Sequence, residues 1–173
     1  MSDEGASPRE LLLESCRRNN SSLLTSVLSS FASADKIAHF LNTSTDGLGC
    51  SALHIAAQYG SYEVLDVLLD QEGVEIDGQE KREGDTCLHK AVRWVNEQGK
   101  EAWEEDGRVV EILLDAGCDP RIRNKAKLKP FDLVDPRNTE LRKSLQKAEF
   151  TIAAGDDVVQ DDSDDGGPAS DSD

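Results

Sequence analysis

The sequence predicts an all-α fold, a solenoid built from stacked turn–helix–helix repeats. The segment at residues 49–60, GCSALHIAAQYG, reappears at residues 84–94 as GDTCLHKAVRW. Residues 64–73 (VLDVLLDQEG) likewise match residues 109–120 (VVEILLDAGCDP), and both carry apolar residues on one helical face before a glycine suited to a left-handed cap. Because one helix pair cannot bury its apolar face alone, such internal repeats indicate a stack with a continuous core.

The first unit, expected over residues 7–45, opens with a clear helix start. Ser7 is suited to cap the helix, Pro8 to fill its first position and Glu10 to complete a capping box. Residues 11–28 then match both helices of a repeat without its turn motif. Residues 1–6 are expected to form a flexible N-terminus.

Two insertions, near residues 29–45 and 95–105, add length that the repeat pattern does not need. In the first, residues 33–41 (SADKIAHFL) place three apolar side chains on one face, which predicts an extra helix. In the second, Trp103 stands among acidic residues. Two interpretations are open: the indole covers the core, or it anchors a basic partner at an acidic lip.

The later units repeat a short polar motif at the start of their first helices. They are expected over residues 46–80, 81–123 and 124–150, which gives a repeat domain over residues 7–150. The motif pairs a hydroxyl with a histidine three positions later, as Ser51 with His54 and Thr86 with His89. A neutral imidazole donates from one nitrogen and accepts at the other, so the motif is suited to hold a turn together.

A reactive pair formed by Cys87 and His89 is the alternative interpretation of this motif. The same histidine recurs at residue 54, in a unit without a cysteine at the matching position, so a structural task is favoured. Catalysis also requires a nucleophile, a base and an orienting group in one pocket, and the sequence carries no hydrolase, metalloprotease or phosphate-loop motif. We expect no enzyme, no cofactor and no metal site.

With these motifs, the sequence resembles the ankyrin-repeat family, whose unit runs G-x-T-P-L-H-x-A-A-x-x-G and then ends a second helix with L-L-x-x-G-A-D. Residues 113–124, LLDAGCDPRIRN, are especially close. Residues 124–134, NKAKLKPFDLV, resemble a C-terminal cap, although Lys127 stands where glycine is usual and the histidine is missing. The resemblance implies an ankyrin solenoid with short β-hairpin-like turns that binds a protein partner.

The resemblance also implies that partners meet the concave face, made by the turn tips and the exposed ends of the first helices. Tyr59 and Trp94 occupy equivalent positions there, and aromatic residues are favoured at binding hot spots. The alternative for Trp94 is that it packs under the insertion that follows it. The residues expected to bind protein are Leu48, Cys50, Gln58, Tyr59, Arg82, Glu83, Asp85, Arg93, Trp94, Lys125 and Leu128.

Charge restricts the kind of partner. The chain has a formal net charge of −16, and residues 151–173 contain no Lys or Arg, so we expect a disordered acidic tail there. Acidity disfavours direct nucleic-acid binding and favours a basic protein client. About four repeats followed by an acidic tail resemble fungal ankyrin proteins that escort a basic ribosomal protein. The alternative is a stoichiometric inhibitor or assembly factor of an enzyme or larger complex.

The remaining expectations concern the state and location of the chain. The four cysteines form no C-x-x-C pair, which favours reduced thiols. The N-terminal residues, MSDEGASPRE, resemble neither a secretory signal nor a transit peptide, and no apolar run is long enough for a membrane span. We expect a monomer that is cytoplasmic, nuclear or both.

Overall fold

The computed structural model describes residues 5–165, with side chains described through Gly155. Within these residues the fold is helical and has no β-strand, which confirms the predicted all-α solenoid. An isolated bridge between Thr45 and Ser51 pairs the two sides of one turn. The helices are α1 (Pro8–Arg18), α2 (Ser21–Leu28), α3 (Ala34–Thr43), α4 (Ala52–Gln58), α5 (Tyr62–Leu69), α6 (Cys87–Glu97), the 3₁₀ helix η2 (Lys100–Ala102), α7 (Trp103–Asp106), α8 (Arg108–Asp115), α9 (Pro130–Leu133) and α10 (Thr139–Asp165).

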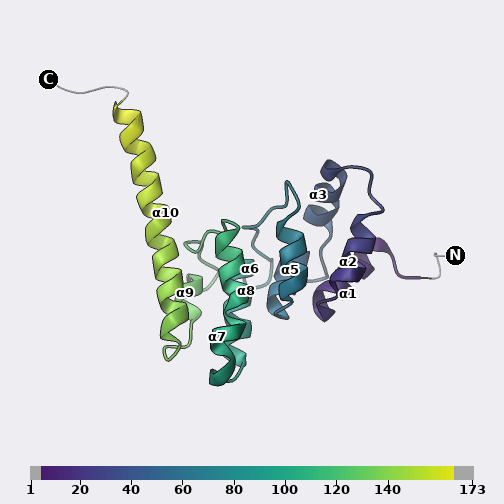
Figure 1. Cartoon of the computed structure of the whole chain (residues 1–173), viewed down its shortest axis with the longest axis horizontal. Helices are drawn as coiled ribbons and strands as arrows, with labels where there is room; N and C mark the ends of the chain where they lie inside the picture. Colours follow the sequence, from purple (N-terminus) through teal and green to yellow (C-terminus); the bar gives the residue numbers. More distant parts are fainter. Residues whose placement is uncertain (1–4, 166–173) are drawn as a thin grey trace.

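The helices stack in sequence order, so that the molecule extends from α1 at one end to α10 at the other (Figure 1). The first helix of each pair packs on the next, with α1 against α4, α4 against α6 and α6 against α9. The second helices follow the same order, with α2 against α5 and α5 against α8. One apolar cluster runs through the stack, from Leu12 in α1 to Leu145 in α10. Stability is therefore shared between neighbouring repeats.

The helix starts follow the chemistry expected from the sequence. Ser7 and Glu10 form a reciprocal capping box at the start of α1, with Pro8 in its first turn. The first insertion contains α3, whose Leu41 is buried. Phe40 of α3 packs on Phe31, with the two ring centroids 4.5 Å apart. The extra helix is present because its apolar face has a surface to cover.

The second insertion folds onto the core. After α6 the chain continues through η2 into α7, which contacts both α6 and α8. Trp103 is 8% exposed and belongs to the apolar cluster, and the guanidinium of Arg137 lies 5.6 Å from its ring centre. Of the two interpretations of Trp103, the structure supports the one in which the indole covers the core.

Residues 151–165 of the C-terminal segment differ from the expected disorder. Helix α10 continues to Asp165, while residues 166–173, like residues 1–4 at the other end, lie outside the described residues. Extending an existing helix adds one backbone hydrogen bond per ordered residue, which is far less costly than starting a new one. Among the described residues, no helix is both long and apolar enough to span a bilayer.

Candidate protein-binding groove

The repeated hydroxyl–histidine motif joins each turn to the next. In α6, Nδ1 of His89 accepts from the backbone N–H of Thr86 at 3.0 Å, and its Nε2 lies 2.8 Å from the carbonyl oxygen of Leu128. A carbonyl can only accept, so Nε2 carries the proton. His54 uses the same geometry: its Nδ1 accepts from Ser51, and its Nε2 contacts the carbonyls of Gly78 and Asp85 at 3.0 and 3.1 Å.

Burial shapes the ionisation of these histidines. Because desolvation disfavours the imidazolium, the pKa values of His54 and His89 lie below the usual 6.5, although the hydrogen-bonded carbonyls act in the opposite direction. The corresponding position of the last unit is Asp132, whose carboxylate accepts from the backbone N–H of Lys129 at 2.9 Å within its own turn. The histidines are thus neutral connectors between repeats.

The alternative Cys87–His89 pair has no geometric basis. Both ring nitrogens of His89 are bound to Thr86 and Leu128. Cys87 is buried, with its Sγ 3.4 Å from the carbonyl oxygen of Ile76 and 3.7 Å from Sγ of Cys118. The hydrogen bond to Cys87 and burial both raise the pKa of Cys118 above its usual value. This environment favours inert thiols.

Two neighbouring hollows form a groove along the turn tips and the ends of α4 and α6. Their volumes are about 260 and 450 Å³, and both are lined by Gln58, Tyr59 and Lys90. Tyr59 is 48% exposed where the hollows meet, and Leu48, at the tip of the first turn, is 50% exposed. These two hollows together make up the groove.

Trp94 lies at the third repeat's side of the groove. It is half-buried, and its ring packs directly on Gly60, so that a Cβ built on that glycine would lie 2.1 Å from Cζ2 of the indole. Trp94 therefore packs across two repeats. The indole also lines the larger hollow together with Arg93.

Two of the expected binding residues are buried. Cys50 is 3% exposed at the base of the smaller hollow, where burial raises its thiol pKa to about 11. Asp85 is 0% exposed. The expectation that these two side chains contact a partner is wrong, because the turn folds both of them inward.

Asp85 belongs to an ion-pair network beneath the groove. Its carboxylate accepts from Nε of Arg93 at 2.8 Å and from Nδ2 of Asn124 at 2.9 Å. Burial by itself raises the pKa of Asp85, but these two hydrogen bonds outweigh it and hold the pKa below the usual value. The network fixes the position of Arg93 on the groove wall.

Three carboxylates of this network lie close enough together to suit a cation: Glu80, Glu83 and Asp85. Lys90 already provides one, with its Nζ 3.1 Å from Glu80 and 3.8 Å from each of the other two. The cluster is therefore an internal salt-bridge network.

The other expected residues divide between the groove and the neighbouring turn. Arg82 and Glu83 line the smaller hollow. Lys125 and Leu128 line neither hollow; the backbone N–H of Lys125 donates to the carbonyl of Glu83 at 2.9 Å, and the carbonyl of Leu128 accepts from His89. These two residues extend the row of turn tips.

Sequence reasoning missed several residues that line the groove. The clearest is Lys90, which aligns with the buried Ile55 of the previous repeat. A lysine at a position where the other repeat has isoleucine was the sequence signal that could have identified Lys90 as a groove residue. The other missed lining residues are Arg17, Asp46, Ile55, Glu80, Glu97 and Gln98.

Charges in the groove balance, whereas those of the second helices do not. The groove is lined by four cationic and four acidic side chains: Arg17, Arg82, Lys90 and Arg93 with Asp46, Glu80, Glu83 and Glu97. Exposed carboxylates instead recur at aligned positions of the second helices. Asp66 of α5 aligns with Glu111 of α8, and Asp70, just after α5, aligns with Asp115 at the end of α8. The chain's acidity thus lies largely outside the groove.

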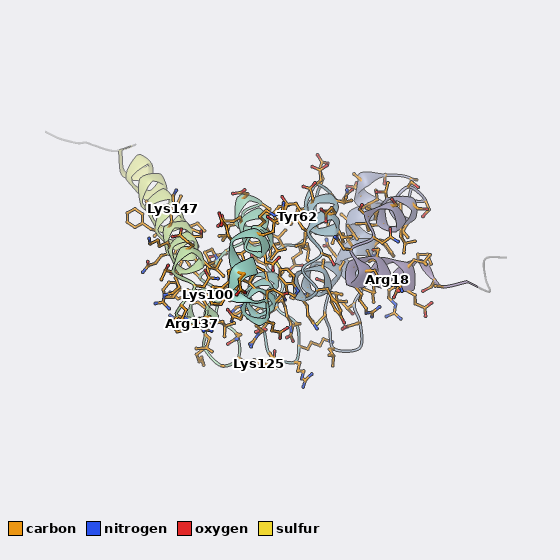
Figure 2. The ribbon with its side chains drawn as sticks, turned by 60° about the horizontal axis from the view of Figure 1, so that its bottom comes forward. Arg18, Tyr62, Lys100, Lys125, Arg137 and Lys147 are labelled. Atoms are coloured by element: carbon orange, nitrogen blue, oxygen red, sulfur yellow. The ribbon has the colours of Figure 1, made fainter. Side chains whose placement is uncertain are left out.

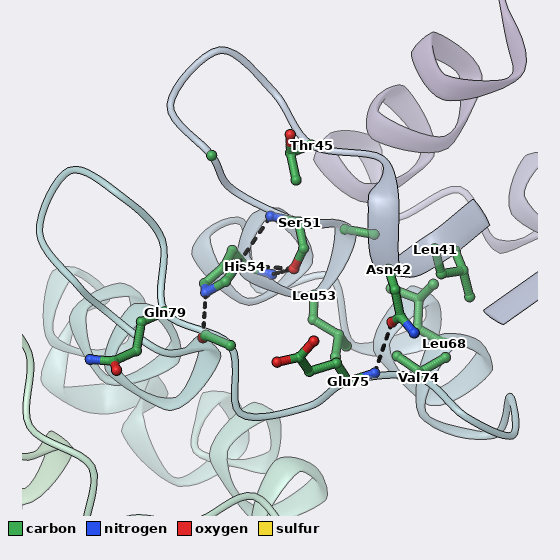
Figure 3. A pocket seen from close by; sticks show the side chains of 13 residues that line it. Leu41, Asn42, Thr45, Ser51, Leu53, His54, Leu68, Val74, Glu75 and Gln79 are labelled. Carbon is green, nitrogen blue, oxygen red and sulfur yellow. Dashed lines mark hydrogen bonds between the residues drawn. The ribbon is translucent and has the colours of Figure 1, made fainter. Parts of the chain in front are cut away.

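A third hollow of about 230 Å³ lies between the end of α3, the turn before α4 and the segment that follows α5 (Figure 3). Asn42 spans one side of it, donating to the carbonyl of Gly73 and accepting from the N–H of Glu75, both at 2.9 Å. His54 lines another side, with its ring bound to Ser51 and Gly78. These polar groups are used by the fold, which makes the groove the better candidate for binding.

Comparison with known proteins agrees with this architecture. Residues 11–124 match the family model described as ankyrin repeats in three copies. An ankyrin repeat-containing protein of Saccharomyces cerevisiae is 44% identical over 155 residues, which cover 88% of this chain and 83% of that protein. Protein phosphatase 1 regulatory subunit 12A is 32% identical in Mus musculus over 104 residues and 33% identical in Rattus norvegicus over 99 residues. These matches cover 60% and 57% of this chain but 9% and 8% of those proteins.

Proposed function

The chain belongs to the ankyrin-repeat family, and from that premise we propose that it is an adaptor holding a protein client in the groove. Ankyrin repeats generally mediate protein–protein interaction. The observation that carries the proposal is the exposed ring of Tyr59 at the junction of the two hollows, opposite the half-buried Trp94. Exposed aromatic side chains beside arginine are typical of binding hot spots.

The finer proposal is that the client is basic and that this protein escorts it. The net charge of −16 supports it, as do the matching exposed carboxylates Asp66 and Glu111 on α5 and α8. A negative surface attracts a cationic client at long range and competes with nucleic acid for it. In this form of the proposal the groove supplies the contact and the outer surface supplies the attraction.

A stoichiometric inhibitor or assembly factor is the second candidate. The balanced charges of the groove favour it, because a contact without net charge depends on shape and apolar burial. One relative is by name a regulatory subunit of a phosphatase, which makes a regulatory role a reasonable second proposal for this chain.

Affinity purification with quantitative mass spectrometry tests the groove. Tyr59→Ala is expected to deplete the client that copurifies with the wild-type chain. Phe150→Ala, which removes a 74% exposed ring on α10, is the matched control and should leave the client in place. Retention of every partner by Tyr59→Ala would overturn the proposal.

Salt separates the two finer candidates. At about 0.5 M NaCl, charges are screened beyond a few ångströms, so an escort held by electrostatic attraction should release its client. Removing the chain after Phe150 should also weaken that complex. A complex that resists both treatments but depends on Tyr59 is the result expected of an inhibitor or assembly factor.

A further inference from the structure

A separate hollow of about 540 Å³ lies between the second insertion, α8 and the start of α10. Its wall includes Lys100, Trp103, Arg137, Asn138 and Leu141. Figure 2 shows Lys100 and Arg137 near each other at the α10 end of the stack. No residue lines both this hollow and the groove.

Two buried donors in this wall have no acceptor. Trp103 is 8% exposed and Asn138 is 5% exposed, and neither the indole Nε1 nor the amide Nδ2 has a hydrogen-bond partner. The other amide atom of Asn138 is satisfied, because Oδ1 accepts from the backbone N–H of Leu141 at 3.2 Å. Buried donors without acceptors carry an uncompensated desolvation penalty, which a bound acceptor would relieve.

The charges around the hollow indicate what kind of acceptor fits. Three cations and three carboxylates line it: Lys100, Arg108 and Arg137 with Glu104, Glu111 and Glu140. The balance favours a neutral acceptor over an anion. Trp103 and Leu141, which are 8% and 4% exposed, are the large apolar residues of the lining. A main-chain carbonyl next to an apolar side chain satisfies both requirements.

We propose that this hollow is a second protein-binding site, which takes an extended peptide segment of a partner. Main-chain carbonyls of the segment accept from Nε1 of Trp103 and Nδ2 of Asn138, and an apolar side chain packs beside Leu141. Neither donor touches solvent in the free protein, so binding includes a side-chain movement. The side chain of Arg137 is 70% exposed and stacks over the indole, and its Nε and Nη2 donate to the carboxylate of Asp135 at 3.1 and 2.8 Å, so this movement displaces a surface ion pair.

Within the described residues, helix α10 begins beside the hollow and leads away from it over 27 residues, while α1 lies at the opposite end of the stack (Figure 1).

Two substitutions remove the donors while keeping their structural roles. Trp103→Phe keeps an aromatic ring in the core but has no N–H. Asn138→Asp keeps the oxygen that caps α10, and an aspartate is well tolerated at that position. Trp103→Phe leaves a small cavity in the core and Asn138→Asp introduces a buried charge, so the melting temperature of each variant is measured first to establish that it is folded.

The test is selection of short random peptides displayed on phage against the full-length chain. Selected peptides should bind Trp103→Phe and Asn138→Asp about tenfold more weakly than the wild-type chain and should bind Tyr59→Ala unchanged. In ¹H–¹⁵N spectra, the indole resonance of Trp103 should move on binding while that of Trp94 stays in place.

Three results would overturn the proposal: no peptide enriched after selection, equal binding to the two donor variants, or a shift confined to Trp94. Equal binding would mean that the donors are satisfied by ordered water alone. Loss of binding in Tyr59→Ala but not in the donor variants would assign the peptides to the groove, so the two proposals fail separately.

Discussion

Nε2 of His89 donates to the carbonyl oxygen of Leu128 across 2.8 Å, joining residues 39 positions apart. The same imidazole accepts from Thr86 through Nδ1, so one side chain closes its own turn and secures the next. His54 performs the same task one repeat earlier. The stack is thus held by polar links as well as by its apolar cluster.

Replacing His89 with Ala is expected to lower the free energy of unfolding by about 1–3 kcal/mol, because the buried Leu128 carbonyl and Thr86 N–H lose their partner. Chemical denaturation measures the change. His39→Ala, at an exposed position of α3, is the control and should stay within about 0.5 kcal/mol. Equal effects at the two positions would contradict the assigned role of His89.

Acid is expected to weaken the fold well above the range in which carboxylates titrate. Burial lowers the pKa values of His54 and His89 below 6.5, so the unfolded chain binds protons more tightly than the folded chain. Their contribution is complete above about pH 6.5 and is lost as the pH falls through the folded-state values.

The melting temperature should therefore be lower at about pH 5.5 than at about pH 7.5, with the drop beginning near pH 6.5. His89→Gln keeps an amide donor and acceptor but removes one titrating group, so the drop should be smaller in that variant. A pH dependence identical to that of the wild-type chain would show that His89 does not titrate in this window.

Gly60→Ala is expected to destabilise the stack and expose Trp94. Gly60 has a φ of +65°, and a Cβ there would overlap the indole. The left-handed conformation alone costs a residue with a side chain about 1–2 kcal/mol. Fluorescence of Trp94, recorded in a Trp103→Phe background, should move to longer wavelength. Gly47→Ala is the control, because no atom lies within 4 Å of a Cβ built there.

Asp85→Ala should lower the free energy of unfolding by about 3 kcal/mol, because it leaves Arg93, Lys90 and Asn124 without their shared buried carboxylate. Glu105→Ala removes a solvent-exposed partner of Arg108 and should cost at most about 1 kcal/mol. Differential scanning calorimetry of the two variants compares them directly. A loss at residue 85 as small as that at residue 105 would show that the buried network adds little to stability.

The repeated elements could be predicted from the sequence because they depend on local patterns. The capping box at Ser7 and the placement of His54 and His89 follow from residues within four positions of one another. The recurrence of the histidine separates a structural task from a catalytic one, since a catalytic group has no reason to be duplicated in register.

Side-chain direction in the turns could not be predicted in the same way. Asp85 occupies a position that would face a partner if the turn were open, yet it points inward. Its partner Asn124 lies 39 residues away, and no local pattern relates the two. Likewise, the choice between the two interpretations of Trp103 depended on how α7 folds back onto α6 and α8.

Asp132 ends the series of hydrogen bonds that link each repeat to the next. An imidazole at this position donates to a carbonyl of the next repeat, as His89 does to Leu128. The carboxylate of Asp132 instead accepts from the backbone N–H of Lys129 in its own turn and has no proton to donate to a further repeat. The residue type at this one position therefore distinguishes an internal repeat, which has histidine, from the last repeat, which has aspartate. Grafting additional modules onto this end would require a histidine there first.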